Sequence, residues 1–400
     1  MKKIISIALA LLMVAVMLPV MAMADETATT ATKLPAADSN GVITLTENVT
    51  LSSFAKIEGK IKLDLNGHTI TCTKNWAIVV VQYGTLTVVD SSAAGTGAIV
   101  CASGDESSRS AIYGGDNTAI IIEGGHLKGV DFGIVLMGID SSLTVNGGVI
   151  EGEQGFGISG NGSMKNGVPE CGPTTITING GEIKGGDVGI YHPQVGKLTI
   201  NNGEITGETG VEIRAGELIV NGGTITATGD PTSTDPNGNG STTVGAAIAV
   251  VQHTTKQPIN VKINGGSFNG VSALYEANPQ KNPEEATEKI GIVVNGGTFN
   301  GDVNKDDVDA SKLLINGGTF TKKESGAEKY LANGKELDSN GKVVNTSITI
   351  IVPGDGGNTT TTPSTDKTKN PGTGANDFVG VAAAMAVVSL LGAAAVIRKK

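Results

Sequence analysis

ITINGGEIKG, residues 176–185, decides the fold, because nearly the same residues recur along the chain. Other copies are LTVNGGVIEG at 143–152, LTINNGEITG at 198–207, LIVNGGTITA at 218–227, VKINGGSFNG at 261–270, IVVNGGTFNG at 292–301 and LLINGGTFTK at 313–322. Apolar and polar residues alternate within each copy, so that Leu198, Ile200 and Ile205 point to one side. This period of two predicts a strand, a tight turn and a second strand with one buried face.

The spacing of the copies favours a parallel β-solenoid over a chain of hairpins. The turn asparagines fall at 179, 201 and 221, so one period is about 22 residues. A second, weaker strand motif follows each turn: SAIYG at 110–114, DFGIVL at 131–136, GFGISG at 155–160, DVGIYH at 187–192, TGVEIR at 209–214 and SALYEA at 272–277. Short strands recurring at such a period are typical of stacked coils.

Aligning the copies predicts columns of stacked side chains, because corresponding residues of successive coils lie about 4.8 Å apart. One inward column is apolar throughout: Ile70, Leu127, Ile150, Ile183, Ile205, Ile225, Phe268, Phe299 and Phe320. The next outward column places charges of alternating sign at Lys128, Glu151 and Lys184. The turn asparagines are expected to hydrogen-bond to one another from coil to coil.

The repeats resemble the right-handed parallel β-helix of the pectate-lyase-like superfamily, found in many surface proteins of Gram-positive bacteria. The resemblance covers 41–321, and GVITLTENVTL followed by LDLNGHTITC is similar to an opening coil. A short leader, 25–40, precedes the helix. Residues 322–352 are expected to cap its open end, because an uncovered sheet edge invites association.

The first residues predict export. Lys2 and Lys3 precede an apolar run, and the small residues Ala22 and Ala24 form a cleavage site, so 1–24 is interpreted as a signal peptide. An uncleaved membrane anchor is the alternative.

The C-terminal end predicts an anchor. A Thr/Pro-rich linker, 353–369, leads to a motif and an apolar run, 378–397, that is long enough to span a bilayer and ends in cations. The region 370–400 resembles the sorting signal of Gram-positive surface proteins, whose sortase cleaves after Thr and links it to peptidoglycan. The motif is Asn370, Pro371, Gly372, Thr373 and Gly374, with Asn where Leu usually stands, which leaves a retained membrane anchor as the alternative.

Composition excludes some classes of function. A formal net charge of −10 disfavours nucleic acid and anionic membranes as partners. The 3 cysteines, Cys72, Cys101 and Cys171, cannot all pair, and one Cys72–Cys101 disulfide is left open. No Cys/His spacing indicates zinc, and no cofactor or metal site is predicted.

No catalytic set can be assembled from the sequence. The lyases and hydrolases that share this fold use clustered Asp with Arg or Lys, or several Asp and His motifs on successive coils. The exported part of this chain holds only Arg109 and Arg214, and only Arg214, near Glu212, lies close to acidic residues. A fold alone does not specify activity, so no catalytic residue is predicted.

One column suggests a ligand. Aligning the second motif gives Val79, Tyr113, Val135, Ser159, Tyr191, Glu212, Ala249 and Tyr275, interpreted as exposed. Aromatic side chains along such a face can stack on sugar rings, with Glu212, Arg214 and His192 as polar contacts. Tyrosines placed only by their β-propensity are the plainer interpretation.

The sequence thus predicts an exported protein of the cell wall or cell surface, alternatively retained in the membrane. Its predicted partners are sortase, peptidoglycan and the membrane during sorting, and a polysaccharide or host surface protein as ligand. Non-catalytic adhesion is the favoured function. A polysaccharide lyase or glycoside hydrolase and a passive structural rod are the alternatives.

Overall fold

The computed structural model describes residues 30–72, 77–101, 109–230, 245–305 and 312–346. The chain divides into two units, Met1–Thr346 and Ser347–Lys400, and all described residues lie in the first. The predicted signal peptide, linker and sorting signal therefore lie outside the described residues. Within the described part of the chain, no helix is long and apolar enough to cross a membrane.

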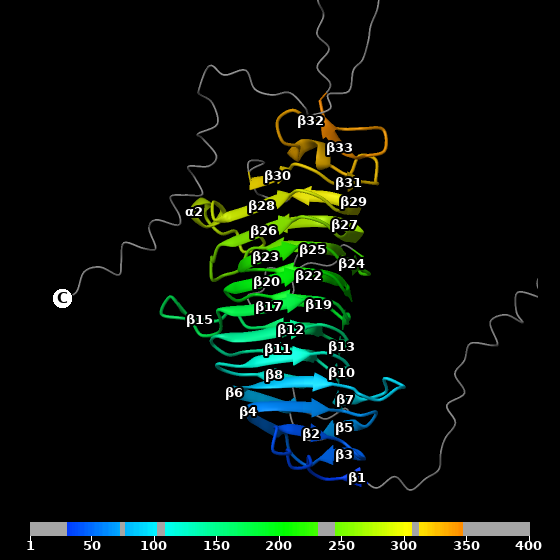
Figure 1. Ribbon diagram of the computed structural model, residues 1–400. Helices are drawn as coiled ribbons and strands as arrows, with labels where there is room; N and C mark the ends of the chain where they lie inside the picture. The colour runs from blue at the N-terminus through cyan, green and yellow to red at the C-terminus, as the bar shows by residue number, and fades with distance from the viewer. Residues whose placement is uncertain (1–29, 73–76, 102–108, 231–244, 306–311, 347–400) are drawn as a thin grey trace, which may run out of the picture. The chain divides into compact units, whose positions relative to one another are not determined.

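The described unit is a parallel β-helix with three stacks of strands, here called faces A, B and C (Figure 1). Face A contains the strands that precede the NGG turns or the equivalent corners of other coils: β2 (Val42–Thr44), β4 (Ala55–Asp64), β6 (Ala77–Val89), β9 (Ala119–Ile122), β12 (Ser141–Val145), β17 (Thr174–Ile178), β20 (Gly196–Ile200), β23 (Gly216–Val220), β26 (Ile259–Ile263), β28 (Ile290–Val294) and β30 (Leu313–Ile315). Each of these strands pairs in parallel with the next one in this order.

Face B contains the strands that follow the turns: β1 (Thr30–Ala31), β3 (Asn48–Leu51), β5 (Thr69–Cys72), β7 (Ala98–Cys101), β10 (His126–Gly129), β13 (Val149–Gly152), β18 (Glu182–Gly185), β21 (Glu204–Gly207), β24 (Thr224–Ala227), β27 (Ser267–Ala277), β29 (Thr298–Lys305) and β31 (Thr319–Phe320). Face C contains the second motif: β8 (Ser110–Gly114), β11 (Phe132–Leu136), β14 (Phe156–Gly160), β19 (Val188–His192), β22 (Thr209–Ile213) and β25 (Ala246–Val251). The first parts of β4 and β6 and the second parts of β27 and β29 extend face C.

A few elements lie outside the three faces. They are the hairpin β15 (Met164–Lys165) and β16 (Val168–Pro169), the helix α2 (Glu284–Thr287), the short helix η2 (Ala327–Tyr330) and the antiparallel pair β32 (Lys335–Leu337) and β33 (Val343–Asn345). The helix η2 and the strands β32 and β33 fall in 322–352, the segment for which a terminal cap was predicted.

The predicted core column is confirmed. Its members are in register from Ile70 to Phe320 and are buried, and Ile99 also belongs to it although no NGG turn precedes it. Towards the C-terminal coils the column becomes aromatic. The ring centroids of Phe268 and Phe299 lie 4.7 Å apart, as do those of Phe299 and Phe320.

The asparagine ladder is also confirmed. Each Nδ2 donates to the Oδ1 of the preceding coil, over 2.8 Å from Asn179 to Asn146, 2.8 Å from Asn201 to Asn179, 2.8 Å from Asn221 to Asn201, 2.9 Å from Asn264 to Asn221, 3.1 Å from Asn295 to Asn264 and 3.0 Å from Asn316 to Asn295. At the N-terminal end Asn146 donates to the Glu123 carboxylate over 3.0 Å. The side-chain amides of the turns are thus hydrogen-bonded to one another from coil to coil, in addition to the backbone hydrogen bonds between the strands.

The glycines of the motif have distinct roles. The second glycine of the turn has positive φ, 84° at Gly181, which strongly favours glycine. Gly185 ends the face B strand at a sharp corner, where a Cβ atom would clash with the carbonyl oxygen of Val188. In this copy of the repeat, glycine thus stands at both ends of the face B strand for different physical reasons.

The alternating charges on face B are in register as predicted, with Lys128 beside Glu151 and Glu151 beside Lys184. Lys128 pairs with Glu151 over 3.1 Å, whereas Lys184 pairs with Glu182, its neighbour on the same strand, over 2.8 Å. Burial alone would raise the pKa of Glu151, but hydrogen bonds from Lys128 and His126 lower it. Such partly exposed pairs each contribute about 0.2–1 kcal/mol.

The three cysteines are buried. Cys72 and Cys101 are in-register neighbours on β5 and β7, at the position that Gly129 and Gly152 occupy in the next coils. The sequence left a Cys72–Cys101 disulfide open, and the structure contains no disulfide bond between these two described residues.

Candidate functional site

The second-motif column lies on face C, and most of its predicted register is present. Tyr113 is in register with Val135, and Tyr191, Glu212, Ala249 and Tyr275 follow one another. The assignment of Val79 is wrong, because Val79 is fully buried and Val80 pairs with Tyr113 instead. The run Ile78–Val81 is apolar at every position, so no alternation indicates which valine faces outward.

The prediction that this column is exposed is wrong for its middle part. Glu212 and Ala249 have 0% of their surface exposed, and Tyr191 has 6%. Ser159, the next residue towards the N-terminus, is buried as well. A glycan cannot lie along this column from Tyr113 to Tyr275 in the observed structure.

Three of the predicted ligand residues do come together, but they are buried rather than exposed. The Arg214 Nη1 donates to the Tyr191 hydroxyl over 3.3 Å and Nη2 donates to the Gln252 carbonyl over 3.2 Å. The Arg214 Nε lies 3.8 Å from a carboxylate oxygen of Glu212, and both side chains are fully buried. The ring of Phe156 stacks on Tyr191, with centroids 5.1 Å apart.

This buried cluster is structural in character. Burial raises the pKa of Tyr191 to about 12, with Arg214 opposing the shift and Glu212 adding to it, so the phenol stays protonated. The lyase alternative depended on Arg214 near Glu212. Because both are fully buried, a polymeric substrate does not reach them in this structure.

His192, unlike the residues of this cluster, faces the core of the coil. It is in register with Ile213 on the adjacent strand and is fully buried, and its ring nitrogens have no hydrogen-bond partner in the part of the chain that the structure describes. Burial lowers its pKa to about 4, so the imidazole is neutral at pH 7. A charged contact from His192 to a ligand is therefore excluded in this conformation.

Tyr275 lies apart from the other predicted residues. It packs against a small cluster of Ala246, Ala249 and Val251 on the neighbouring strand. Tyr275 is half-buried there, and it is not among the residues that line the groove around Tyr113.

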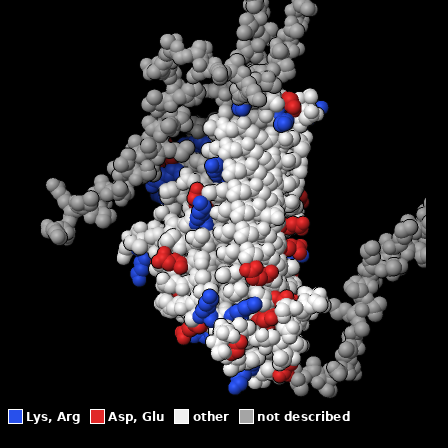
Figure 2. Space-filling model, in the orientation of Figure 1, with Lys and Arg blue, Asp and Glu red and all other residues white. Residues whose placement is uncertain are grey.

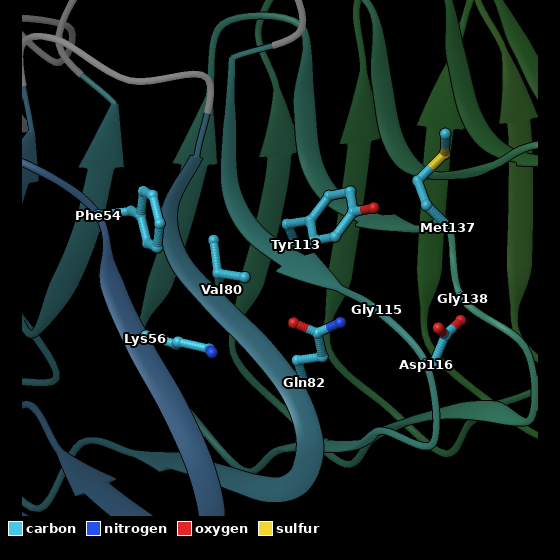
Figure 3. A pocket seen from close by; sticks show the side chains of 9 residues that line it. All are labelled: Phe54, Lys56, Val80, Gln82, Tyr113, Gly115, Asp116, Met137 and Gly138. Carbon is cyan, nitrogen blue, oxygen red and sulfur yellow. The ribbon is translucent and has the colours of Figure 1, made fainter.

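Tyr113 lies in a groove on face C, and this groove is the candidate site (Figure 3). Its volume is about 380 Å³, and its lining residues are Phe54, Lys56, Val80, Gln82, Tyr113, Gly115, Asp116, Met137 and Gly138. The groove crosses successive coils, since Lys56 is in register with Val80 and Val80 with Tyr113. At about 4.8 Å per coil it follows the stacking direction.

The lining has an apolar and a polar side. Figure 3 shows Phe54, Val80, Tyr113 and Met137 in one row across the strands, and Lys56, Gln82 and Asp116 in a second row. An apolar surface with a few polar groups beside it is the usual composition of a small-molecule or sugar site.

The charges of the groove are largely balanced. Lys56 Nζ lies 2.7 Å from the Glu58 carboxylate, and Asp116 Oδ1 accepts a hydrogen bond from the Ile139 N–H over 2.9 Å. Burial raises the pKa of Tyr113, and the charges of Cys171 and Asp116 raise it further, so its hydroxyl remains a donor. Figure 2 shows both charge signs interspersed over the N-terminal coils of the visible face.

Sequence reasoning found Tyr113 but missed its neighbours in the groove. Phe54, 39% exposed, precedes the first full coil and matches no repeat, so alignment of motifs could not place it. The available signal was composition, because an aromatic residue in a chain with 3% aromatics stands out.

The described residues contain no group of three or more His, Cys, Asp or Glu arranged to hold a metal ion. Comparison of the chain with protein-family models, curated proteins and solved structures gave no match. The groove therefore has to be interpreted from its own chemistry.

Proposed function

We propose that this protein is an exported, cell-surface β-helix of the pectate-lyase-like type that binds a polysaccharide without catalysis. The observation that carries the proposal is the groove of Phe54 and Tyr113, with Gln82 and Asp116 beside them. Aromatic rings offer an apolar surface to the C–H face of a sugar, and adjacent polar groups bond to its hydroxyls. A groove that crosses coils suits a linear polymer.

The binding proposal predicts that Tyr113→Ala weakens retention of the full chain by a polysaccharide about tenfold or more, as expected for loss of one buried aromatic anchor. Tyr113→Phe retains the ring and is expected to lose less. The measurement is native electrophoresis of the purified full chain, in mild detergent, through gels containing galactomannan, soluble β-glucan, mucin or polygalacturonate.

Tyr275→Ala is the matched control, because it removes a half-buried tyrosine of the same face that does not line the groove. If Tyr275→Ala abolished retention and Tyr113→Ala did not, the groove would be the wrong site. If no polysaccharide retarded the unmodified protein, binding of a surface protein or a structural role would replace this proposal.

The surface location rests on the terminal sequences. We propose that the signal peptide, 1–24, directs export and that a sortase joins Thr373 to peptidoglycan in the wall of a Gram-positive cell. Thr373→Ala is expected to move most of the protein from the wall fraction to the membrane or medium, because the residue that forms the new bond is changed. Fractionation and immunoblotting of cells measure this, with Thr368→Ala in the linker as control. Unchanged wall attachment of Thr373→Ala would contradict sorting and favour the membrane anchor.

A further inference from the structure

Tyr83 has an unusual backbone conformation. Its φ is +55°, in the left-handed region, and 60% of the residue is exposed. The strand register makes Asn117 and Asp140 its equivalents in the next two coils, and these have φ of +50° and +52°. Asn and Asp tolerate this conformation, whereas a bulky aromatic residue there is an outlier.

The turn gives no packing reason for a tyrosine. The ring is largely exposed, and the turn is held by backbone bonds, with the Tyr83 N–H donating to the Asp116 carbonyl over 3.0 Å and the Asn117 N–H to the Ile139 carbonyl over 2.8 Å. Neither bond depends on the side chain at position 83. Strain of this kind, kept at an exposed position, points to a function of the side chain.

Tyr83 lies at the edge of the candidate groove. Gln82, the preceding residue, lines the groove, and so does Asp116, whose carbonyl accepts the Tyr83 N–H. Phe54 and Ile139, which are 39% and 42% exposed, border the same region. The other exposed large apolar residues in the described ranges are Val168, Val271 and Leu314. Exposed apolar side chains are thus concentrated around this groove.

The charges indicate which polysaccharides fit. The positive charge of Lys56 is compensated by Glu58 at 2.7 Å, and Asp116 is the lining residue with a negative charge. The chain itself has a net charge of −10. Uronate, sialate or sulfate groups would meet no uncompensated cation in this lining, and the overall field would repel them.

We propose that Tyr83 is a sugar-stacking residue of this groove and that the ligand is a neutral polysaccharide. The inference rests on the proposed function, since it assigns a residue and a ligand class to the same site. The strained backbone would present the ring at the groove edge, next to the polar row of Gln82 and Asp116.

The test compares Tyr83→Asn, Tyr83→Phe and the unmodified full chain by affinity electrophoresis with galactomannan, soluble β-glucan and polygalacturonate. Tyr83→Asn keeps a residue that accepts positive φ, so it is expected to melt at the same temperature or higher while losing about tenfold in retention by a neutral polysaccharide. Tyr83→Phe keeps the ring and is expected to retain binding. A structural role for Tyr83 would instead lower the melting temperature of the Asn variant.

The outcomes separate this inference from the proposed function. Retention of the unmodified chain by a neutral polysaccharide, unchanged in Tyr83→Asn, would overturn the role of Tyr83 and leave the groove intact. Retention by polygalacturonate alone would overturn the ligand class. Retention by none of these polymers would overturn both the inference and the proposed function.

Discussion

Replacing Phe299 by alanine is expected to lower the free energy of unfolding by about 3–5 kcal/mol. Phe299 has 0% of its surface exposed, and its ring lies between those of Phe268 and Phe320, each at 4.7 Å. Truncation removes buried apolar surface and both ring contacts. It also leaves a cavity that neighbouring strands, fixed by their pairing on each side, cannot easily fill. Chemical unfolding followed by circular dichroism measures the loss.

Leu314→Ala is the control, because Leu314 lies in the next coil but is 42% exposed, and its expected effect is below about 0.5 kcal/mol. In a stacked structure the C-terminal coils can unfold separately, so the transition of Phe299→Ala is expected to broaden as well. Equal stabilities of the two variants would show that the aromatic column is not a principal part of the core.

Acidification from pH 7 to pH 4 is expected to remove about 3 kcal/mol of stability through His192 alone, since one pKa unit corresponds to about 1.4 kcal/mol. Burial lowers its pKa from 6.5 to about 4 in the folded state. Between these values the unfolded chain binds the proton more readily than the folded one. The contribution is therefore fully present above pH 6.5 and is lost as the pH falls towards 4.

His192→Leu is expected to remove this part of the pH dependence, because leucine has no titratable group. Leucine also matches the apolar character of Ile213, the in-register residue of the adjacent coil. Unfolding free energies of both proteins, measured at several pH values between 4 and 7, give the difference. Parallel pH profiles for the two proteins would mean that His192 is solvated or bonded in solution and titrates normally.

The repeats predicted the core and the ladder well because both depend on position within one coil. Once the copies are aligned, the register of Ile183 with Ile205 and the bond from Asn201 to Asn179 follow from stacking alone. The same alignment predicted Tyr113 on face C, where the groove lies.

Burial on face C could not be predicted in the same way. Alternation indicates which side chains point out of a strand, but not whether another part of the chain covers them. Arg214 and Glu212 point out of their coil and are nonetheless fully buried. The groove likewise depends on Phe54, which belongs to no repeat. The positive φ of Tyr83, next to the lining residue Gln82, could not be predicted either, because aromatic residues rarely adopt it.

The asparagine ladder has a consequence for how such a chain can diverge. Successive ladder partners are separated by 33, 22, 20, 43, 31 and 21 residues, yet every step is closed by one side-chain hydrogen bond. The turn that carries the asparagine is thus the same in each of these coils, while the number of residues in the rest of the coil varies. Segments of different length between successive asparagines therefore leave this ladder intact. New binding surfaces can therefore arise by insertion rather than by rebuilding the core.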